Sequence, residues 1–183
     1  MSRNRANDVL KLVLTALFAA LVCVATMLVP IYVPVTGGYA NLGDGIILLG
    51  AFLLHPLYAV IAAGVGSMLA DILASYVQYA PATLVIKAAV ALVAALIYNH
   101  FGKGKQLKVS ILWMAVAGFA AEIVMVLGYF FYEAVVLQYG MAAAGAILPN
   151  VGQGVVGIVV ACITAPLLQN NGEVKNLMNK TWK

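Results

Sequence analysis

Charged and amide side chains interrupt otherwise apolar stretches of this chain at a small number of positions. They are Asp44, Asp71, Lys87, Glu122, Glu133, Asn150 and Gln153. Groups of these types recognise small polar molecules through hydrogen bonds and ion pairs. The chemistry that these residues indicate is therefore the binding of a small polar molecule.

Helical spacing places several of these groups together. Glu122, Val126, Tyr129 and Glu133 share one face of a helix at intervals of three or four residues. Another helix carries Asn150, Gly154, Gly157 and Ala161 on one face, with Gln153 beside them, as its sequence shows. The pattern predicts a cavity lined by rings, amides and a few charges, which suits a small, flat, polar molecule.

The composition shows what kind of protein must position these groups. The chain has 183 residues and 19.2 kDa, with 64% hydrophobic residues, 9% charged residues and a mean hydropathy of +1.03. A soluble domain carries roughly 25% charged residues. The composition excludes an ordinary soluble enzyme, a disordered chain and a nucleic-acid-binding protein, despite a pI near 9.1. Cys23 and Cys162 lie in apolar runs, so we expect neither a disulfide framework nor a metal site.

The apolar runs predict an all-α integral membrane protein with six transmembrane helices in a single domain over residues 1–183. A spanning helix needs about 20 mainly apolar residues. The stretch between residues 46 and 70 reads as one long helix or as two helices broken at His55-Pro56. The six helices are expected at about 9–29, 41–54, 57–75, 82–98, 109–136 and 147–168. The second is short, so it must be tilted or enclosed by the others.

The basic residues decide between five and six helices. Apart from Lys87, they lie near the amino end, in residues 102–108 and in the carboxyl tail, which includes Lys183. Short basic segments stay in the cytoplasm. Six helices place all three segments on that side, whereas five would separate them. We therefore predict a multi-pass protein with both termini cytoplasmic and with anionic lipid headgroups near its basic ends.

Structural roles compete with ligand binding at two of the charged positions. Asp44 follows Gly43 at a helix start, where an N-cap is the favoured interpretation. Lys87 either neutralises Asp71 or Glu122 as a buried pair or contacts a ligand, because a lone charge in the membrane is costly.

Helix 9–29 carries a different signal. Ala16, Ala20 and Cys23 form a stripe of small residues, and small residues four apart allow another helix to approach closely in lipid. The helix carries no polar or charged residue that we would assign to the cavity. The chain also lacks a Walker A glycine loop, so it cannot power transport with ATP by itself.

Five short stretches together resemble the S components of energy-coupling factor (ECF) vitamin transporters over nearly the whole chain. They are Asn41-Leu42-Gly43-Asp44-Gly45, Gly64-Val65-Gly66-Ser67 leading to Ala70-Asp71, Tyr79-Ala80-Pro81-Ala82-Thr83, Ile86-Lys87 and Asn150-Val151-Gly152-Gln153-Gly154. The pair of Ala16 and Ala20 matches the family motif that contacts the transmembrane T component.

The resemblance implies a non-catalytic, vitamin-binding subunit of a prokaryotic cell membrane. Its partners would be a T component and two cytoplasmic ATPases of the ABC type, which use ATP; this chain itself would bind no cofactor. Residues matching the family pocket are Tyr39, Lys87, Glu122, Tyr129, Asn150 and Gln153. The 122–133 stretch with the Asn150 and Gln153 pair looks most like members assigned to hydroxymethylpyrimidine or pyridoxine, and riboflavin ranks lower.

Two other function classes compete with this interpretation. A stand-alone, proton-coupled carrier or channel would need no ATPase. An intramembrane aspartyl protease would use Asp44 and Asp71, but the Gly-x-Gly-Asp motif of such enzymes is incomplete in Asn41-Leu42-Gly43-Asp44.

Overall fold

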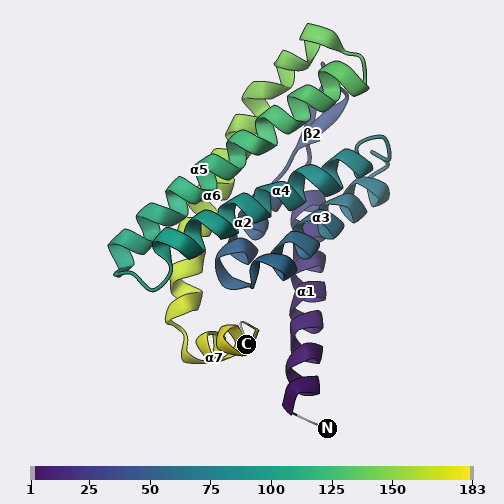
Figure 1. The fold of residues 1–183 in the computed structure, drawn as a ribbon. Coiled ribbons are helices and arrows are strands. Elements are labelled where there is room, and N and C mark those ends of the chain that lie inside the picture. The colour runs from purple at the N-terminus through teal and green to yellow at the C-terminus, as the bar shows by residue number, and fades with distance from the viewer. Residues whose placement is uncertain (1–2, 182–183) are drawn as a thin grey trace.

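The computed structural model describes residues 3–181 as a bundle of helices (Figure 1). Lys183, which was counted among the basic residues of the tail, lies outside the described residues. The helices are α1 Arg3–Leu28, α2 Gly43–Leu53, α3 Pro56–Leu73, α4 Ala80–Ile97, α5 Leu107–Phe131, α6 Ile147–Asn170 and α7 Gly172–Thr181. Single π-helical turns, Tyr98–Gly102 and Tyr132–Val136, extend α4 and α5, and a 3-10 helix, Gly140–Ala146, leads into α6.

The structure confirms the all-helical membrane architecture. Within residues 3–181, five helical segments are long and apolar enough to cross a membrane, and α2 is a shorter apolar helix. The chain breaks between α2 and α3 at His55, whose ring accepts a hydrogen bond from the Leu57 amide while Pro56 opens α3. Proline is tolerated at the start of a helix because its missing N–H would have no partner there. The two-helix interpretation of residues 46–70 is therefore correct.

The short helix α2 is enclosed by its neighbours, which is one of the two arrangements that we predicted from its length. All its residues except Ile46 are buried, and α1, α4 and α6 pack around it. Its Leu48 and Phe52 are almost completely inaccessible and form the centre of the hydrophobic core. An 11-residue helix spans only about 16 Å. It can lie at membrane depth because protein, rather than lipid, surrounds it.

Besides the 3-10 helix Gly140–Ala146, two elements lie outside the six predicted helices. A small antiparallel hairpin pairs β1 Ile31–Val33 with β2 Gly38–Ala40, with Tyr32 opposite Tyr39. Each strand has three residues, too few for a period-2 pattern to be recognised. Gly37, with φ +65°, makes the turn that reverses the chain. The second element, α7, is polar and short and was missed because only apolar runs were counted.

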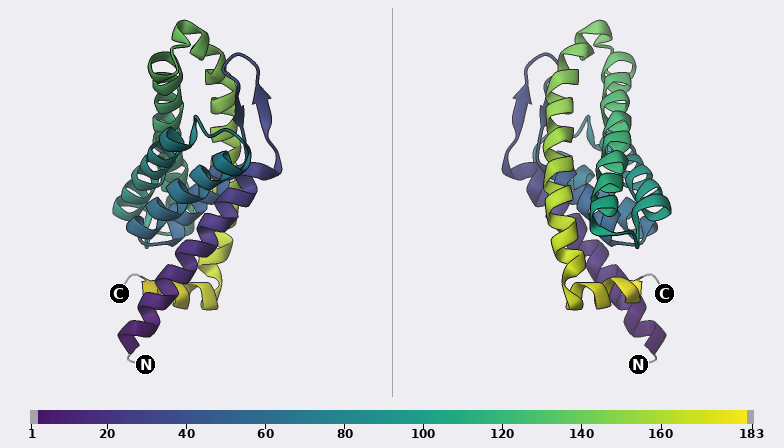
Figure 2. Two further views of the ribbon diagram at one scale, coloured as in Figure 1. Left: turned by 90° about the vertical axis from the view of Figure 1, so that its right-hand side faces the viewer. Right: turned by 90° about the vertical axis from the view of Figure 1, so that its left-hand side faces the viewer.

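Two helix boundaries differ from the prediction. Helix α1 begins at Arg3 instead of residue 9, because its charged first residues continue the helix beyond the apolar run. The regular part of α5 ends at Phe131, and the remaining residues to Val136 form a π-helical turn. The first turn of α1 and helix α7 lie at the same end of the bundle, whereas the hairpin lies toward the opposite end (Figures 1 and 2).

Helices α1 and α3 touch at a glycine. A Cβ atom at Gly66 would lie 2.4 Å from the Ala19 carbonyl oxygen and 2.9 Å from Val22 Cβ. Both distances are shorter than van der Waals contact, so only glycine allows the two helix backbones to come this close.

We predict that Gly66→Ala lowers the thermal unfolding temperature of the detergent-purified protein and destabilises it by about 1–3 kcal/mol, because the added methyl group separates α1 from α3. Gly152→Ala is the matched control, because nothing lies within 4 Å of a Cβ there. Equal unfolding temperatures for the two variants would contradict the close contact.

Candidate functional site

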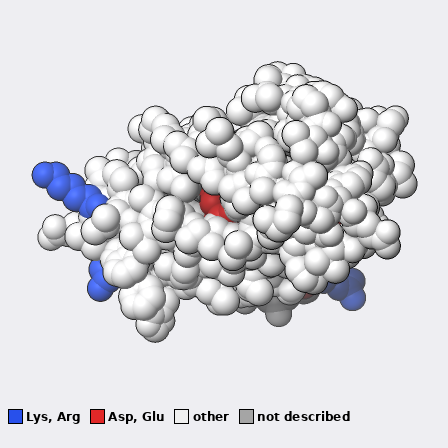
Figure 3. All heavy atoms as spheres, turned by 90° about the horizontal axis from the view of Figure 1, so that it is seen from above, with Lys and Arg blue, Asp and Glu red and all other residues white. Residues whose placement is uncertain are grey.

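A polar cavity opens at the end of the bundle opposite the first turn of α1 and helix α7. Seen from that end, most of the face is uncharged, and acidic atoms are visible at the bottom of a central hollow (Figure 3). The cavity is bounded by the outer end of α1, the β-hairpin and helices α3 to α6. Its lining residues are Thr26, Val33, Thr36, Gly38, Tyr39, Asn41, Ser67, Asp71, Tyr79, Thr83, Lys87, Tyr129, Glu133, Ala146, Asn150 and Gln153.

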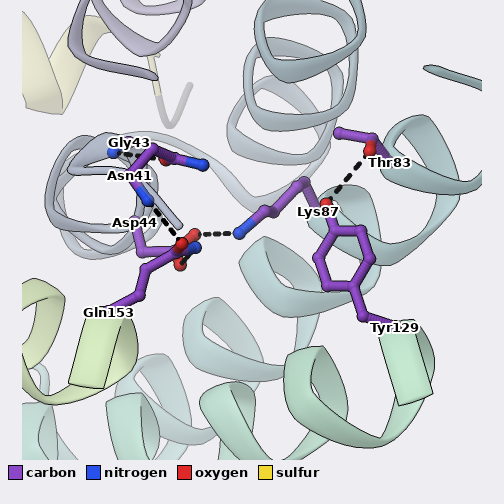
Figure 4. Close-up of polar contacts among 7 residues, drawn as sticks. All are labelled: Asn41, Gly43, Asp44, Thr83, Lys87, Tyr129 and Gln153. Atoms are coloured by element: carbon purple, nitrogen blue, oxygen red, sulfur yellow. Dashed lines mark hydrogen bonds and ion pairs between the residues drawn. The ribbon is translucent and has the colours of Figure 1, made fainter. Parts of the chain in front are cut away.

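A buried ion pair lies at the base of this cavity. Lys87 Nζ of α4 is 2.6 Å from Asp44 Oδ1 at the start of α2, and both side chains are almost fully buried. The amide nitrogen of Gln153, from α6, donates to the other carboxylate oxygen of Asp44 (Figure 4). Three helices are thus joined through one carboxylate.

The structure corrects the roles that the sequence suggested for Asp44 and Lys87. Asp44 does not cap α2, because the N-cap position is Leu42 and no side chain caps it. Lys87 pairs with Asp44 instead of Asp71 or Glu122. A glycine of α6 allows Asp44 to be buried, because a Cβ at Gly157 would lie 3.0 Å from Asp44 Cβ. Asp44 is thereby held inside the bundle and not at a solvated helix end.

Gln153 also fixes the loop that leads into α2. Its side-chain oxygen accepts a hydrogen bond of 2.7 Å from the Asn41 backbone amide, and the Asn41 side chain accepts one of 2.9 Å from the Gly43 amide. Both ends of the Gln153 amide are therefore occupied. Its main effect in this structure is to position Asn41 and Asp44 at the cavity base.

Two tyrosines form the polar part of the wall nearer the mouth of the cavity. The Tyr39 hydroxyl donates to Asp71 Oδ1 at 2.7 Å, and burial together with the nearby Asp71 charge raises the pKa of Tyr39. The Tyr79 hydroxyl lies 2.9 Å from the Thr36 carbonyl oxygen and 3.1 Å from Glu133 Oε1. Burial, reinforced by the Glu133 charge, raises the pKa of Tyr79 as well. Both hydroxyls therefore stay protonated and act as donors.

Tyr129 connects the ion pair to the opposite wall. Its hydroxyl lies 3.0 Å from Thr83 Oγ1, and the Lys87 ammonium lies 5.5 Å from the centre of its ring (Figure 4). An ammonium at this distance from an aromatic face is attracted by the ring quadrupole. Tyr129 therefore helps to hold Lys87 in place and offers a ring edge to the cavity.

Several polar atoms of the cavity wall have no protein partner. Within the described residues, Ser67 Oγ, Asp71 Oδ2 and Glu133 Oε2 are buried without a hydrogen bond. The Asn150 side chain lines the cavity, and it too makes no hydrogen bond to another described residue. Buried polar groups without a partner are costly. The wall is therefore complementary to a ligand that brings several hydrogen-bond donors and an amide-like edge.

Of the six predicted binding residues, the structure brings five to this cavity: Tyr39, Lys87, Tyr129, Asn150 and Gln153. Glu122 lies elsewhere. It lines a separate apolar hollow between α5 and α6, where it packs against Gly154 beside Phe119 and Val126. Its carboxyl group is buried, and neither oxygen has a hydrogen-bond partner among the described residues. Helical spacing correctly placed Glu122 on an inner face but could not tell which of two hollows it faces.

Helix α1 contributes to the site, contrary to expectation. Thr26 lines the cavity and is buried, with its hydroxyl so close to Gly43 that a Cβ there would lie 2.2 Å away. A lone threonine in an apolar helix gives no sequence signal. Five lining residues that were not among the six predicted binding residues lie in the stretches that carry the family resemblance, which was the available clue. They are Asn41, Ser67, Asp71, Tyr79 and Thr83.

The small residues Ala16 and Ala20 face away from the bundle. Both are exposed, together with Val13, Leu17 and Val24 of the same helix. Internal packing therefore does not account for them. The face of α1 that packs inside the bundle is a different one, which includes Val22 and Thr26.

Comparison with known proteins agrees with this geometry. Residues 6–170 match the family model described as the S component of ECF-type riboflavin transporters. The chain belongs to this family. An uncharacterised protein of Pyrococcus woesei is 42% identical over 140 residues, which covers 76% of this chain and 88% of that protein. A solved S component of a bacterial ECF transporter shares the fold, with a TM-score of 0.64 and 24% identity over 87% of this chain and 95% of that one.

Family membership establishes the class of function. The protein is a multi-pass membrane protein and a non-catalytic, substrate-binding S component, whose family implies a T component, ATPase partners and a vitamin substrate. The protease alternative does not fit, because the Asp44 carboxylate is occupied by Lys87 and Gln153 instead of being poised beside Asp71.

We predict that Asp44→Asn and Lys87→Met each destabilise this S component by about 3–5 kcal/mol, because each leaves the other charge buried without its partner. The double variant should lose clearly less than the sum of the two. A double-mutant cycle on unfolding in mixed detergent micelles measures the coupling. Strictly additive losses would show that the pair contributes no interaction energy.

Proposed function

We propose that this S component captures riboflavin in the polar cavity and delivers it across the membrane together with a T component and two ATPases. The observation that supports this most directly is the set of unpartnered polar atoms on the cavity wall, at Ser67, Asp71 and Glu133, beside the rings of Tyr39 and Tyr129. Carboxylate oxygens need hydrogen-bond donors. The ribityl chain of riboflavin supplies hydroxyl donors, and its flat ring system can lie against the tyrosines.

Asn150 supplies a second argument for this substrate. Its amide is the free polar group of α6 in the cavity, since Gln153 is already bonded at both ends. An amide presents one donor and one acceptor, which complements the imide edge of a flavin. Hydroxymethylpyrimidine and pyridoxine, which the sequence favoured, carry fewer hydrogen-bond donors than riboflavin and would leave more of the unpartnered wall atoms unsatisfied. The family match also favours riboflavin.

The proposed orientation follows from the charges. The cavity lies at the end opposite the first turn of α1 and helix α7, and the basic segments of the described chain lie at the end where those two elements meet (Figure 1). The positive-inside rule then places the cavity mouth outside the cell and both termini in the cytoplasm. A binding subunit that captures scarce vitamin from outside needs this arrangement.

We expect the purified S component to quench riboflavin fluorescence on binding at one site per protein, with hydroxymethylpyrimidine and pyridoxine failing to compete at equal concentration. Calorimetry gives an independent affinity. Competition by either smaller ring at riboflavin-like affinity would reassign the substrate while leaving the binding role in place.

Two paired variants locate the site. Glu133→Gln removes an acceptor from the cavity and Asn150→Ala removes the amide, so each should weaken binding by about tenfold or more. Glu173→Gln is the matched control for Glu133→Gln, because Glu173 lies on α7 at the opposite end of the bundle. Weakening by Glu122→Gln alone would place the ligand between α5 and α6 instead.

The uncovered face of α1 is proposed as the surface for the T component. Ala16→Trp with Ala20→Trp should abolish ATP-dependent uptake into vesicles holding the complete transporter, while riboflavin binding changes less than twofold. These side chains point away from the cavity, so bulk added there affects only partner contact. Uptake by the S component alone, driven by a proton gradient, would instead support a stand-alone carrier.

A further inference from the structure

A second large hollow lies at the opposite end of the bundle, where the connection between α4 and α5 meets the corner between α6 and α7. Its volume is about 430 Å³. It is lined by Phe52, Tyr98, Lys103, Gly104, Lys105, Leu107, Ser110, Pro166, Gln169, Asn170, Lys175, Met178 and Asn179. None of the residues assigned to riboflavin binding or to T-component contact is among them. We call this hollow the basal pocket.

The rim of the basal pocket is positively charged. Lys103 and Lys105 come from the α4–α5 connection and Lys175 from α7, and no carboxylate is among the lining residues. Partial burial lowers the pKa of Lys103 to about 8. A nearby anion stabilises the charged form of an ammonium group. The amides of Asn170 and Asn179 add hydrogen-bond donors at the same rim.

The floor of the basal pocket is already satisfied by protein. The Tyr98 hydroxyl lies 3.0 Å from Ser110 Oγ and donates to Gln169 Oε1 at 3.2 Å, while Gln169 Nε2 donates to the Phe52 carbonyl at 3.1 Å. These bonds join α2, the end of α4, α5 and α6. The floor is thus fixed in shape, and recognition of a ligand depends on the lysines and amides of the rim.

One side of the pocket is apolar. Leu107 is exposed, and Pro166 and Met178 are half-buried beside Phe52. A free phosphate ion would leave most of this hollow and all of its apolar wall uncovered. A basic rim next to an apolar wall instead matches an amphiphile that carries a negative headgroup on a hydrocarbon chain.

Helix α7 forms the wall that completes the pocket. Lys175, Met178 and Asn179 are spaced by three and four residues and line the hollow from one face of the helix. The helix lies across the end of the bundle and packs against α6 and α1 (Figure 2). A short amphipathic helix in this position lies at the level of the lipid headgroups.

We propose that the basal pocket binds an anionic phospholipid, with its phosphate held by Lys103, Lys105 and Lys175 and an acyl chain lying along Leu107 and Pro166. The lipid would then join the α4–α5 connection to α7. This site is independent of the vitamin cavity and of the proposed substrate.

The test compares two triple variants that remove the same charge. Lys103→Gln, Lys105→Gln and Lys175→Gln neutralise the rim, whereas Lys11→Gln, Lys108→Gln and Lys180→Gln neutralise lysines outside it. Each protein is reconstituted in nanodiscs of phosphatidylcholine with phosphatidylglycerol, extracted gently, and examined by native mass spectrometry. We expect retained phosphatidylglycerol to fall about tenfold or more in the rim variant and less than twofold in the control. Equal losses in both would overturn the site.

Two further arms separate lipid from free anion. Inorganic phosphate, added up to millimolar concentration in pure phosphatidylcholine nanodiscs, should not raise the unfolding temperature of the wild-type protein, whereas phosphatidylglycerol should. Leu107→Ser should reduce lipid retention while leaving the unfolding temperature in phosphatidylcholine unchanged. Stabilisation by phosphate alone, without lipid retention, would overturn the proposal in favour of a small-anion site.

Discussion

The buried pair of Lys87 and Asp44 is the constraint on which the rest of this structure depends. A single charge at membrane depth is costly, and it becomes tolerable only when a partner and further hydrogen bonds surround it. Asp44 meets this condition by lying on a helix too short to span the membrane and almost wholly enclosed. Gln153 then completes its shell from α6. The short helix α2, unusual in a membrane protein, is therefore what allows the charge to be buried inside protein.

Close approach of α6 follows from the same constraint. Gly157 packs on Asp44, and Gly45 packs on Val160, where a Cβ would lie 3.0 Å from a side-chain methyl group. A larger residue at either glycine would push α6 outward and draw Gln153 away from the carboxylate. The glycines of this seam thus contribute to the electrostatics of the site as well as to packing. Because the base of the cavity is held by bonds within the protein, the free polar atoms nearer its mouth are the ones left for a ligand.

Much of this arrangement was predictable from the sequence, because lipid imposes simple rules on length and charge. Apolar runs predicted the spanning helices, and the break before Pro56 separated α2 from α3. The partner of Lys87 was not predictable, because depth along a helix does not determine which neighbour a side chain meets. That choice depends on how the helices rotate about their axes, and here the glycines of α6 decide it. Glu122 shows the same limit, since its helical face adjoins two hollows and spacing alone cannot distinguish them. The strands of the hairpin are too short to produce a pattern, and α7 is too short and too polar to read as a spanning helix.

Residues with different proposed roles lie on different parts of the protein surface. Ligand-facing polar atoms gather at one end, and lysines gather around the basal pocket at the other. The exposed small residues of α1 lie on the flank between them. A subunit that must hold its ligand while its partners change state benefits from this separation, because a contact made on α1 does not have to deform the cavity wall. Thr26 is the exception, since it places the outer end of α1 against the start of α2. Any movement of α1 relative to the bundle would therefore reach the cavity through Thr26 and Gly43, two residues from the Asn41 amide that Gln153 holds.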